Sequence, residues 1–132
     1  MARAIRQNFL SFGKPKSGGL IVDNAAGSGY MTIELARRGF RVIATDLTFR
    51  ELVNLKNVLT KVGLRKRVLL VCSDSQAIPI TSDEADGLVA NSILEHLPDE
   101  TRAVSEITRV VKRGAPVMVA MPISYRYVLP FL

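Results

Sequence analysis

Short apolar runs alternate with longer amphipathic stretches along the chain. The runs are continuously apolar rather than alternating with polar residues, which is typical of parallel strands that are buried on both faces. We expect five of them to be strands, at Leu20–Val22, Val42–Thr45, Val68–Cys72, Gly87–Ala90 and Pro116–Met121.

Apolar residues at helical spacing lie between these runs. The first helix is expected at Tyr30–Arg38, with Gly39 as its stop after two arginines. The apolar face of the second helix consists of Leu52, Leu55, Leu59 and Val62, and this helix ends at Gly63. The third helix begins near Pro98 with Asp99 as its N-cap, ends at Gly114 and has an apolar face of Ala103, Ile107, Val110 and Val111.

Strands that alternate with helices predict an α/β fold with a doubly wound, Rossmann-like parallel sheet of about five strands. In such a fold the site lies at the carboxyl ends of the strands. We divide the chain into a basic N-terminal arm or helix at residues 1–17, the Rossmann-like domain at 18–122 and an apolar tail at 123–132. A hydrophobic fraction of 48% excludes a disordered chain, and no apolar run approaches the ~20 residues of a membrane span.

The most informative segment is the turn that follows the first strand. The strand runs into an acid, Asp23, and then into small residues that end at Gly29. Gly27 and Gly29 have no side chain that would keep a ligand away from the backbone. The second strand also ends in an acid, Asp46, which is placed to hold a ribose. Together these residues predict a nucleoside-containing cofactor.

Two residues favour S-adenosylmethionine over a dinucleotide. The dinucleotide fingerprint has a third glycine three residues after the second, and Thr32 stands at that position. The carboxylate of Asp23 would repel a pyrophosphate, whereas it would attract the sulfonium and the amino group of S-adenosylmethionine.

Four segments, in their order and spacing, resemble class I S-adenosylmethionine-dependent methyltransferases. The resemblance is to the methyltransferase type 11-like branch that includes ubiquinone-biosynthesis-like enzymes, and it covers about residues 18 to 122. In the first segment Ala25 stands at the family's first glycine, a replacement that is strained only if the residue adopts a positive φ. The segments are Val22–Gly29, Arg41–Asp46, Cys72–Pro79 and Asp86–Asp99.

The resemblance implies transfer of a methyl group from S-adenosylmethionine, with S-adenosylhomocysteine as the product, to an acceptor that is a small molecule, RNA or protein. It implies that Asp46 holds the ribose hydroxyls and that Asp74 and Ser75 meet the adenine. The loop after the fourth strand would run under the methionine part. The implied cofactor-binding residues are Asp23, Ala25, Gly27, Gly29, Asp46, Leu47, Asp74, Ser75 and Asn91.

Simpler roles stay open for several of these residues. The two glycines could serve only a tight turn, Asp46 could cap the following helix, and Asp74 could be an ordinary loop acid. The catalytic residues are unknown, because methyl transfer depends mainly on the alignment of the reacting atoms. His96, the one histidine, is a weak candidate for a general base, and a structural or cofactor-side role is favoured for it.

Cysteine and histidine are too few for metal chemistry. One residue of each type cannot form a typical zinc site, so no metal is expected. Cys72 lies in an apolar run, and we expect a buried core thiol rather than a nucleophile. A lone cysteine fits a reducing compartment, and we expect a cytoplasmic location.

The chain is basic, with 18 Lys and Arg against 12 Asp and Glu and a net charge of +6. This charge permits an anionic partner, including RNA, although aromatic residues for base stacking make up only 6% of the chain. Helix C-termini account for the basic clusters at Lys61–Arg67 and Arg109–Arg113. The N-terminal arm is interpreted as a basic helix, with a transit peptide as the alternative.

The chain departs from the family at its C-terminal end. The family has seven strands, and residues Ile123–Leu132 cannot supply two strands and a helix. The fifth strand would be an open edge, which the apolar tail, a partner subunit or a second copy could cover. Three interpretations stay open: a compact methyltransferase completed by a partner, a non-catalytic or truncated cofactor-binding subunit, and a nucleotide-binding oxidoreductase-like domain.

Overall fold

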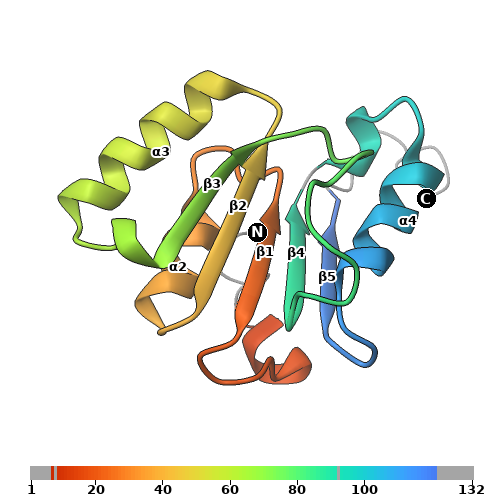
Figure 1. Cartoon of the computed structure of the whole chain (residues 1–132), viewed down its shortest axis with the longest axis horizontal. Coiled ribbons are helices and arrows are strands. Elements are labelled where there is room, and N and C mark those ends of the chain that lie inside the picture. The colour runs from red at the N-terminus through yellow and green to blue at the C-terminus, as the bar shows by residue number, and fades with distance from the viewer. Residues whose placement is uncertain (1–6, 8, 92, 122–132) are drawn as a thin grey trace, which may run out of the picture.

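Five parallel strands form one open sheet in the order β3-β2-β1-β4-β5 (Figure 1). The computed structural model describes residues 7, 9–91 and 93–121. The chain enters the sheet at its centre, moves outward to one edge and then crosses back to the other edge, which is the doubly wound arrangement that the sequence predicts. The strands are β1 at Leu20–Asn24, β2 at Arg41–Asp46, β3 at Val68–Cys72, β4 at Gly87–Asn91 and β5 at Val117–Ala120.

Helices cover both faces of the sheet. The α-helices α2, at Tyr30–Arg37, and α3, at Phe49–Lys61, lie on one face, and α4, at Glu100–Val110, lies on the other (Figure 1). Three short turns complete the described elements: a π-helical turn η1 at Phe9–Gly13 and 3-10 turns η2 at Arg65–Arg67 and η3 at Leu94–His96.

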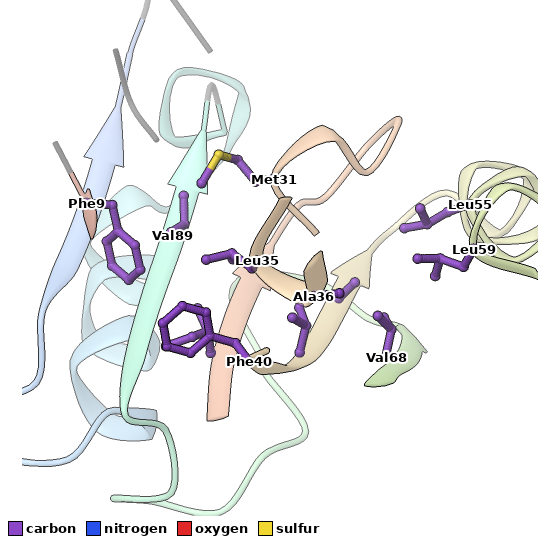
Figure 2. Packing of buried hydrophobic residues seen from close by; sticks show 12 residues of the cluster. Phe9, Met31, Leu35, Ala36, Phe40, Leu55, Leu59, Val68 and Val89 are labelled. Atoms are coloured by element: carbon purple, nitrogen blue, oxygen red, sulfur yellow. The ribbon is translucent and has the colours of Figure 1, made fainter. Parts of the chain in front are cut away.

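The larger core lies between the sheet and α2, α3 and η1. Leu35 and Phe40 occupy its centre, Leu55 and Leu59 close it from α3, and Phe9 closes it at the other end (Figure 2). Phe9 is 1% exposed, so at least this part of the N-terminal arm belongs to the domain. A second cluster on the opposite face buries the apolar side of α4 against Val22, Leu88 and Ala90.

The third helix ends earlier than the sequence predicts. Asp99 is its N-cap as expected, because Asp99 Oδ1 accepts a hydrogen bond from the Arg102 N–H at 3.0 Å. The predicted stop at Gly114 is wrong, since α4 ends at Val110 and Val111 forms a parallel bridge with Ala85. Backbone N–H groups of residues 83–85 donate to the carbonyls of residues 109 and 110, so a neighbouring segment satisfies the end of the helix.

Cys72 corrects another expectation, because its side chain is exposed rather than part of the core. It is the last residue of β3, a strand that pairs only with β2 among the described residues, so its neighbourhood is open on one side. The thiol donates a hydrogen bond to the carbonyl of Leu47 at 3.5 Å.

Some expectations lie outside the described residues. These are the structure of residues 1–6 in the arm and of the apolar tail at 123–132. Within the described part, β5 pairs with β4 alone, and Val117 and Val119 are 40% and 39% exposed. No helix in that part is long and apolar enough to cross a membrane.

The segment between β3 and β4 is a loop, not a helix. Residues 73–86 contain turns and bends, and none of the described helices lies in front of β2 and β3 on that face of the sheet (Figure 1). Side chains on this face remain accessible, and Leu69 of β3 is 59% exposed.

Asp86 fastens the beginning of β1 to the segment that precedes β4. Asp86 Oδ2 accepts a hydrogen bond from the Leu20 N–H at 2.8 Å, and the Lys112 ammonium group donates to Asp86 Oδ1 at 2.9 Å. The Asp86 N–H in turn donates to the Leu20 carbonyl at 2.8 Å. The hydrogen bond from Lys112 is the main reason that the pKa of Asp86 lies below its ordinary value.

We predict that Asp86→Asn lowers the free energy of unfolding at pH 7 by about 1–2 kcal/mol, because charge-assisted hydrogen bonds are lost. The folded state has the lower pKa, so the carboxylate stabilises the fold above the unfolded value of 3.8 and loses this effect as the pH falls through the folded-state pKa. Urea denaturation at several pH values checks this. Glu84→Gln, a change of an exposed acid two residues away, is the control and should have little effect.

Candidate cofactor site

Polar side chains gather where the central strands end. Asp23 and Asn24 end β1, Asp46 ends β2 and Asn91 ends β4. Because the strands are parallel, these residues share one edge of the sheet. A cavity of about 320 Å³ opens there, lined by Asp23, Ala25, Ala26, Gly27, Ser28, Tyr30, Met31 and Asn91.

The carboxyl group of Asp23 is buried, with 2% of the residue exposed. Burial raises its pKa to about 6, although the hydroxyl of Thr32 donates a hydrogen bond to Oδ2 at 2.6 Å and opposes this shift. At neutral pH the group is therefore a poorly solvated carboxylate. Such a group attracts a cation more strongly than an exposed acid does.

Thr32 has a role that its place in the motif did not reveal. It stands where a dinucleotide fingerprint has its third glycine, and it is fully buried between α2 and β1. Its hydroxyl is the side-chain hydrogen-bond donor to Asp23. A side-chain hydrogen bond therefore links α2 to β1. The dinucleotide fingerprint has glycine, which carries no side chain, at this position.

The turn from β1 to α2 is built from left-handed residues. Ala25 has a φ of 62°, the positive value at which a non-glycine residue is strained. Gly29 has a φ of 81°, and a Cβ added there would lie 2.1 Å from Leu55 Cδ1, so α3 leaves no room for a side chain. A Cβ at Gly27 would meet nothing within 4 Å, so its backbone faces open space.

Asp46 connects this turn to the start of α3. Its Oδ2 accepts a hydrogen bond from the Gly27 N–H at 2.8 Å, and its Oδ1 accepts one from the Thr48 N–H at 2.8 Å. The N-cap of α3 is Thr48, so the alternative that Asp46 itself caps the helix is wrong. Each carboxylate oxygen has a further lone pair that can accept from a hydroxyl group.

The residues expected beside the adenine are already engaged within the chain. Asp74 Oδ1 accepts from the Gln76 N–H at 2.8 Å, and the Gln76 side-chain amide lies 3.2 and 3.4 Å from its two oxygens. Ser75 is buried, and its hydroxyl donates to Asn24 Oδ1 at 3.1 Å. Leu47 is 71% exposed beside Asp46. Contacts of Asp74, Ser75 and Leu47 with a cofactor stay predictions.

A buried polar cluster around Asn24 was not predicted. Asn24 Oδ1 accepts hydrogen bonds from Thr45 Oγ1 at 2.9 Å and from Ser75 Oγ at 3.1 Å, so one side chain joins the ends of β1 and β2 to the loop after β3. Its amide nitrogen is buried and has no hydrogen-bond partner among the described residues. The sequence signal for this cluster was the side-chain amide of Asn24 at the end of an apolar strand. Buried polar groups normally have hydrogen-bond partners, so partners for Asn24 could have been expected.

His96 does not line the cavity around Asp23. Its side chain is 71% exposed, and Nε2 lies 3.8 Å from Oε1 of Glu95, a long separation for an ion pair. Of the expected site residues, the cavity brings together Asp23, Ala25, Gly27 and Asn91. The remaining ones lie outside its lining: Gly29, Asp46, Leu47, Asp74, Ser75 and His96. In the described part of the chain no three His, Cys, Asp or Glu residues are arranged to hold a metal ion.

The residues at this edge fit a cofactor that carries positive charge and hydroxyl groups. Asp23 offers a buried carboxylate, Asp46 offers acceptor oxygens, and Gly27 offers a backbone that a ligand can approach. These features suit the charges and the ribose of S-adenosylmethionine.

Comparison with known proteins gives the same family. Residues 22–119 match the sequence profile of the family described as "Methyltransferase domain". A demethylmenaquinone methyltransferase of Thermobifida fusca is 33% identical over 110 residues, which cover 78% of this chain and 43% of that protein. The corresponding protein of Corynebacterium kroppenstedtii is 33% identical over 100 residues, with 76% and 40% covered. The chain thus spans less than half the length of these curated relatives.

Solved structures share the fold. A candidate S-adenosyl-L-methionine-dependent methyltransferase of Methanococcus maripaludis superposes with a TM-score of 0.76 at 25% identity, covering 84% of this chain and 50% of that one. A protein of Pyrococcus horikoshii superposes with a TM-score of 0.81 at 18% identity, covering 97% of this chain and 59% of that one.

We predict that Ala25→Gly raises the free energy of unfolding by about 1 kcal/mol, because glycine adopts a positive φ without the steric cost that alanine has there. Chemical denaturation followed by circular dichroism measures the free energy of unfolding. The slope of this free energy against denaturant concentration should be the same as in the wild type. The matched control is Ala26→Gly, because Ala26 is not among the residues with positive φ. Ala26→Gly should lower the free energy of unfolding. An equal loss in Ala25→Gly and Ala26→Gly would show that Ala25 is not strained.

Proposed function

The chain belongs to the S-adenosylmethionine-dependent methyltransferase family, and we propose that it binds S-adenosylmethionine at the carboxyl edge of its sheet and transfers the methyl group to an acceptor. The observation that carries this proposal is the buried carboxylate of Asp23 at a cavity beside the glycine turn, with Asp46 holding that turn from β2.

Each part of the edge has a chemical role in this proposal. Asp23 attracts the charged methionine part, because burial leaves its carboxylate with little solvent to compete. Asp46 accepts hydrogen bonds from the ribose hydroxyls. Asp74 and Ser75 lie beside the adenine, Leu47 lies next to the ribose site, and Asn91 lines the cavity on the side of β4.

When bound, S-adenosylmethionine supplies a methyl group on a sulfonium, which is already a good leaving group. The protein's contribution is then to hold the donor so that the acceptor atom, the methyl carbon and the sulfur lie in one line. The residues that line the described cavity include no histidine, cysteine or lysine. The role we assign to Asp23 in this cavity is charge attraction and positioning of the donor.

Titration calorimetry tests the cofactor assignment. S-adenosylmethionine and S-adenosylhomocysteine should bind, and NAD should not, because the carboxylate of Asp23 repels a pyrophosphate. Asp46→Asn should weaken S-adenosylmethionine binding by about tenfold or more, because two ribose hydroxyls lose a charged acceptor. Thr48→Ala is the matched control, since it keeps the backbone N–H that Asp46 accepts, and its affinity should be unchanged. If neither adenosyl ligand binds, the proposal is wrong.

The ionisation of Asp23 gives the proposal a pH dependence. Between 3.8 and about 6 the folded protein binds more protons than the unfolded chain at this residue, so stability falls as the pH rises through this range. The stability of Asp23→Asn relative to the wild type should therefore rise with pH across this range, by about 3 kcal/mol in total.

The same substitution should weaken S-adenosylmethionine binding at pH 7.5 and remove its pH dependence, whereas wild-type affinity should fall below pH 6 as Asp23 is protonated. Denaturation and calorimetry at matched pH values measure both effects. Asp83→Asn, an exposed acid that does not line the cavity, is the control. If the wild-type stability did not fall with rising pH relative to that of Asp23→Asn, Asp23 would not be the buried group that ionises.

The acceptor is a separate proposal. Two relatives are named demethylmenaquinone methyltransferases, so a demethylmenaquinone is the first acceptor to test, followed by RNA and protein substrates. Because the chain spans less than half of these relatives, the acceptor site could need a partner subunit or a second copy, and the assay should be repeated at high protein concentration. Cofactor binding without transfer to any acceptor would favour a non-catalytic binding subunit.

A further inference from the structure

A hollow lies where β1, β2 and β3 begin, on the face of the sheet where no described helix covers β2 and β3. Its volume is about 470 Å³, and it is lined by Leu20, Arg41, Val42, Ile43, Arg65, Lys66, Arg67, Val68 and Leu69. The strands are parallel, so their first residues lie at the edge of the sheet opposite to Asp23 and Asp46. The hollow is therefore separate from the candidate cofactor site.

Four cations surround this hollow. They come from the start of β2 and from η2, and none of the four forms an ion pair with a carboxylate in the described part of the chain: Arg41, Arg65, Lys66 and Arg67. Two guanidinium groups are held in place by the backbone, because Arg65 Nη1 donates to the Val68 carbonyl at 2.7 Å and Arg67 Nη1 donates to the Gly39 carbonyl at 3.3 Å. None of the described residues that line this hollow is acidic, so it favours an anion.

The floor of the hollow is apolar. Leu20, Ile43 and Leu69 also line a second hollow of about 360 Å³, together with Val71, Pro79 and Ile80. Because the two hollows share these three residues they adjoin, and we call them together the trough. Leu69, which lines both hollows, is 59% exposed, and no helix of the described residues covers β3 on this side. A single acid, Glu84, lines the second hollow. The trough therefore has a cationic end and an apolar extension.

We propose that this trough binds an anionic lipid, with the headgroup against the cations and the hydrocarbon chain along the apolar floor. Hydrocarbon gains by leaving water on such a floor, and lysine and arginine attract an anionic headgroup. RNA fits less well, because the lining residues include no aromatic side chain for base stacking. A phosphate backbone would also leave Leu20 and Leu69 exposed to water. This site is independent of methyl transfer.

Calorimetry with dodecanoate tests the proposal, because this probe carries a carboxylate and a hydrocarbon chain. Dodecanoate should bind below its micelle concentration, whereas acetate, which lacks the chain, and dodecyl maltoside, which lacks the charge, should bind about tenfold or more weakly. Equal binding of dodecanoate and dodecyl maltoside would overturn the role of the cations. Tighter binding of a single-stranded oligonucleotide than of dodecanoate would replace the lipid with RNA.

Two variants separate the headgroup site from the chain site. The double variant Arg41→Gln/Lys66→Gln changes the cations whose side chains make no hydrogen bond in the described structure, and it should lower dodecanoate affinity about tenfold or more. Leu69→Ser should also lower dodecanoate affinity, because it removes apolar surface from the floor that the hydrocarbon chain would contact. The control pair Arg102→Gln/Arg113→Gln removes the same charge elsewhere and should bind like the wild type.

S-adenosylmethionine affinity should stay unchanged in all three variants, which shows that they are folded and that this test is separate from the proposed function. Unchanged dodecanoate affinity in both Arg41→Gln/Lys66→Gln and Leu69→Ser would place the lipid elsewhere and overturn the proposal.

Discussion

The turn between β1 and α2 is the constraint on which the rest of the candidate site depends. Between residues 24 and 30 the chain leaves a buried strand, reverses and starts a helix that lies back on the same sheet. Ala25, Gly27 and Gly29 all adopt left-handed backbone conformations to make this possible. The turn is held from β2, because Asp46 Oδ2 accepts from the Gly27 N–H and the Thr45 carbonyl accepts from the Ala26 N–H. The pairing of β1 with β2 therefore determines where a cofactor meets the backbone.

Strain and burial at this turn have a common explanation. Ala25 costs stability where glycine would not, and the carboxylate of Asp23 costs stability at neutral pH where a neutral residue would not. Proteins retain such features at sites whose activity needs them. A bound cation would offset the unfavourable burial of Asp23, so the same group that weakens the free protein would strengthen the complex.

Periodicity predicted the layers because it depends on local contacts, and so the five strands, the three helices and the cap at Asp99 follow from the sequence. What it missed depends on residues distant in the chain. Ser75 reaches Asn24 across 51 positions, and Val111 leaves the helix because Ala85 pairs with it. Cys72 lies in an apolar run, yet it is exposed because β3 is an edge in the described structure. Of the candidate site, Asp23, Ala25, Gly27 and Asn91 line one cavity. The other candidates do not line it: Gly29, Asp46, Leu47, Asp74, Ser75 and His96.

The loop at residues 73–86 affects both edges of the sheet, the one with the candidate cofactor site and the one with the hollow. At the carboxyl edge it places the Ser75 hydroxyl on Asn24, and the Gln76 N–H donates to Asp74 in the turn that follows. Because the loop contains no helix, it leaves Ile43 and Leu69 without a cover near the opposite edge. The dipoles of α2 and α3 account for Arg37 and Lys61 at the ends of these helices, but not for the three cations of η2. A ligand with both a hydrocarbon chain and a negative charge, as proposed above, would cover Leu69 and meet these cations, which have no ion pair within the described residues.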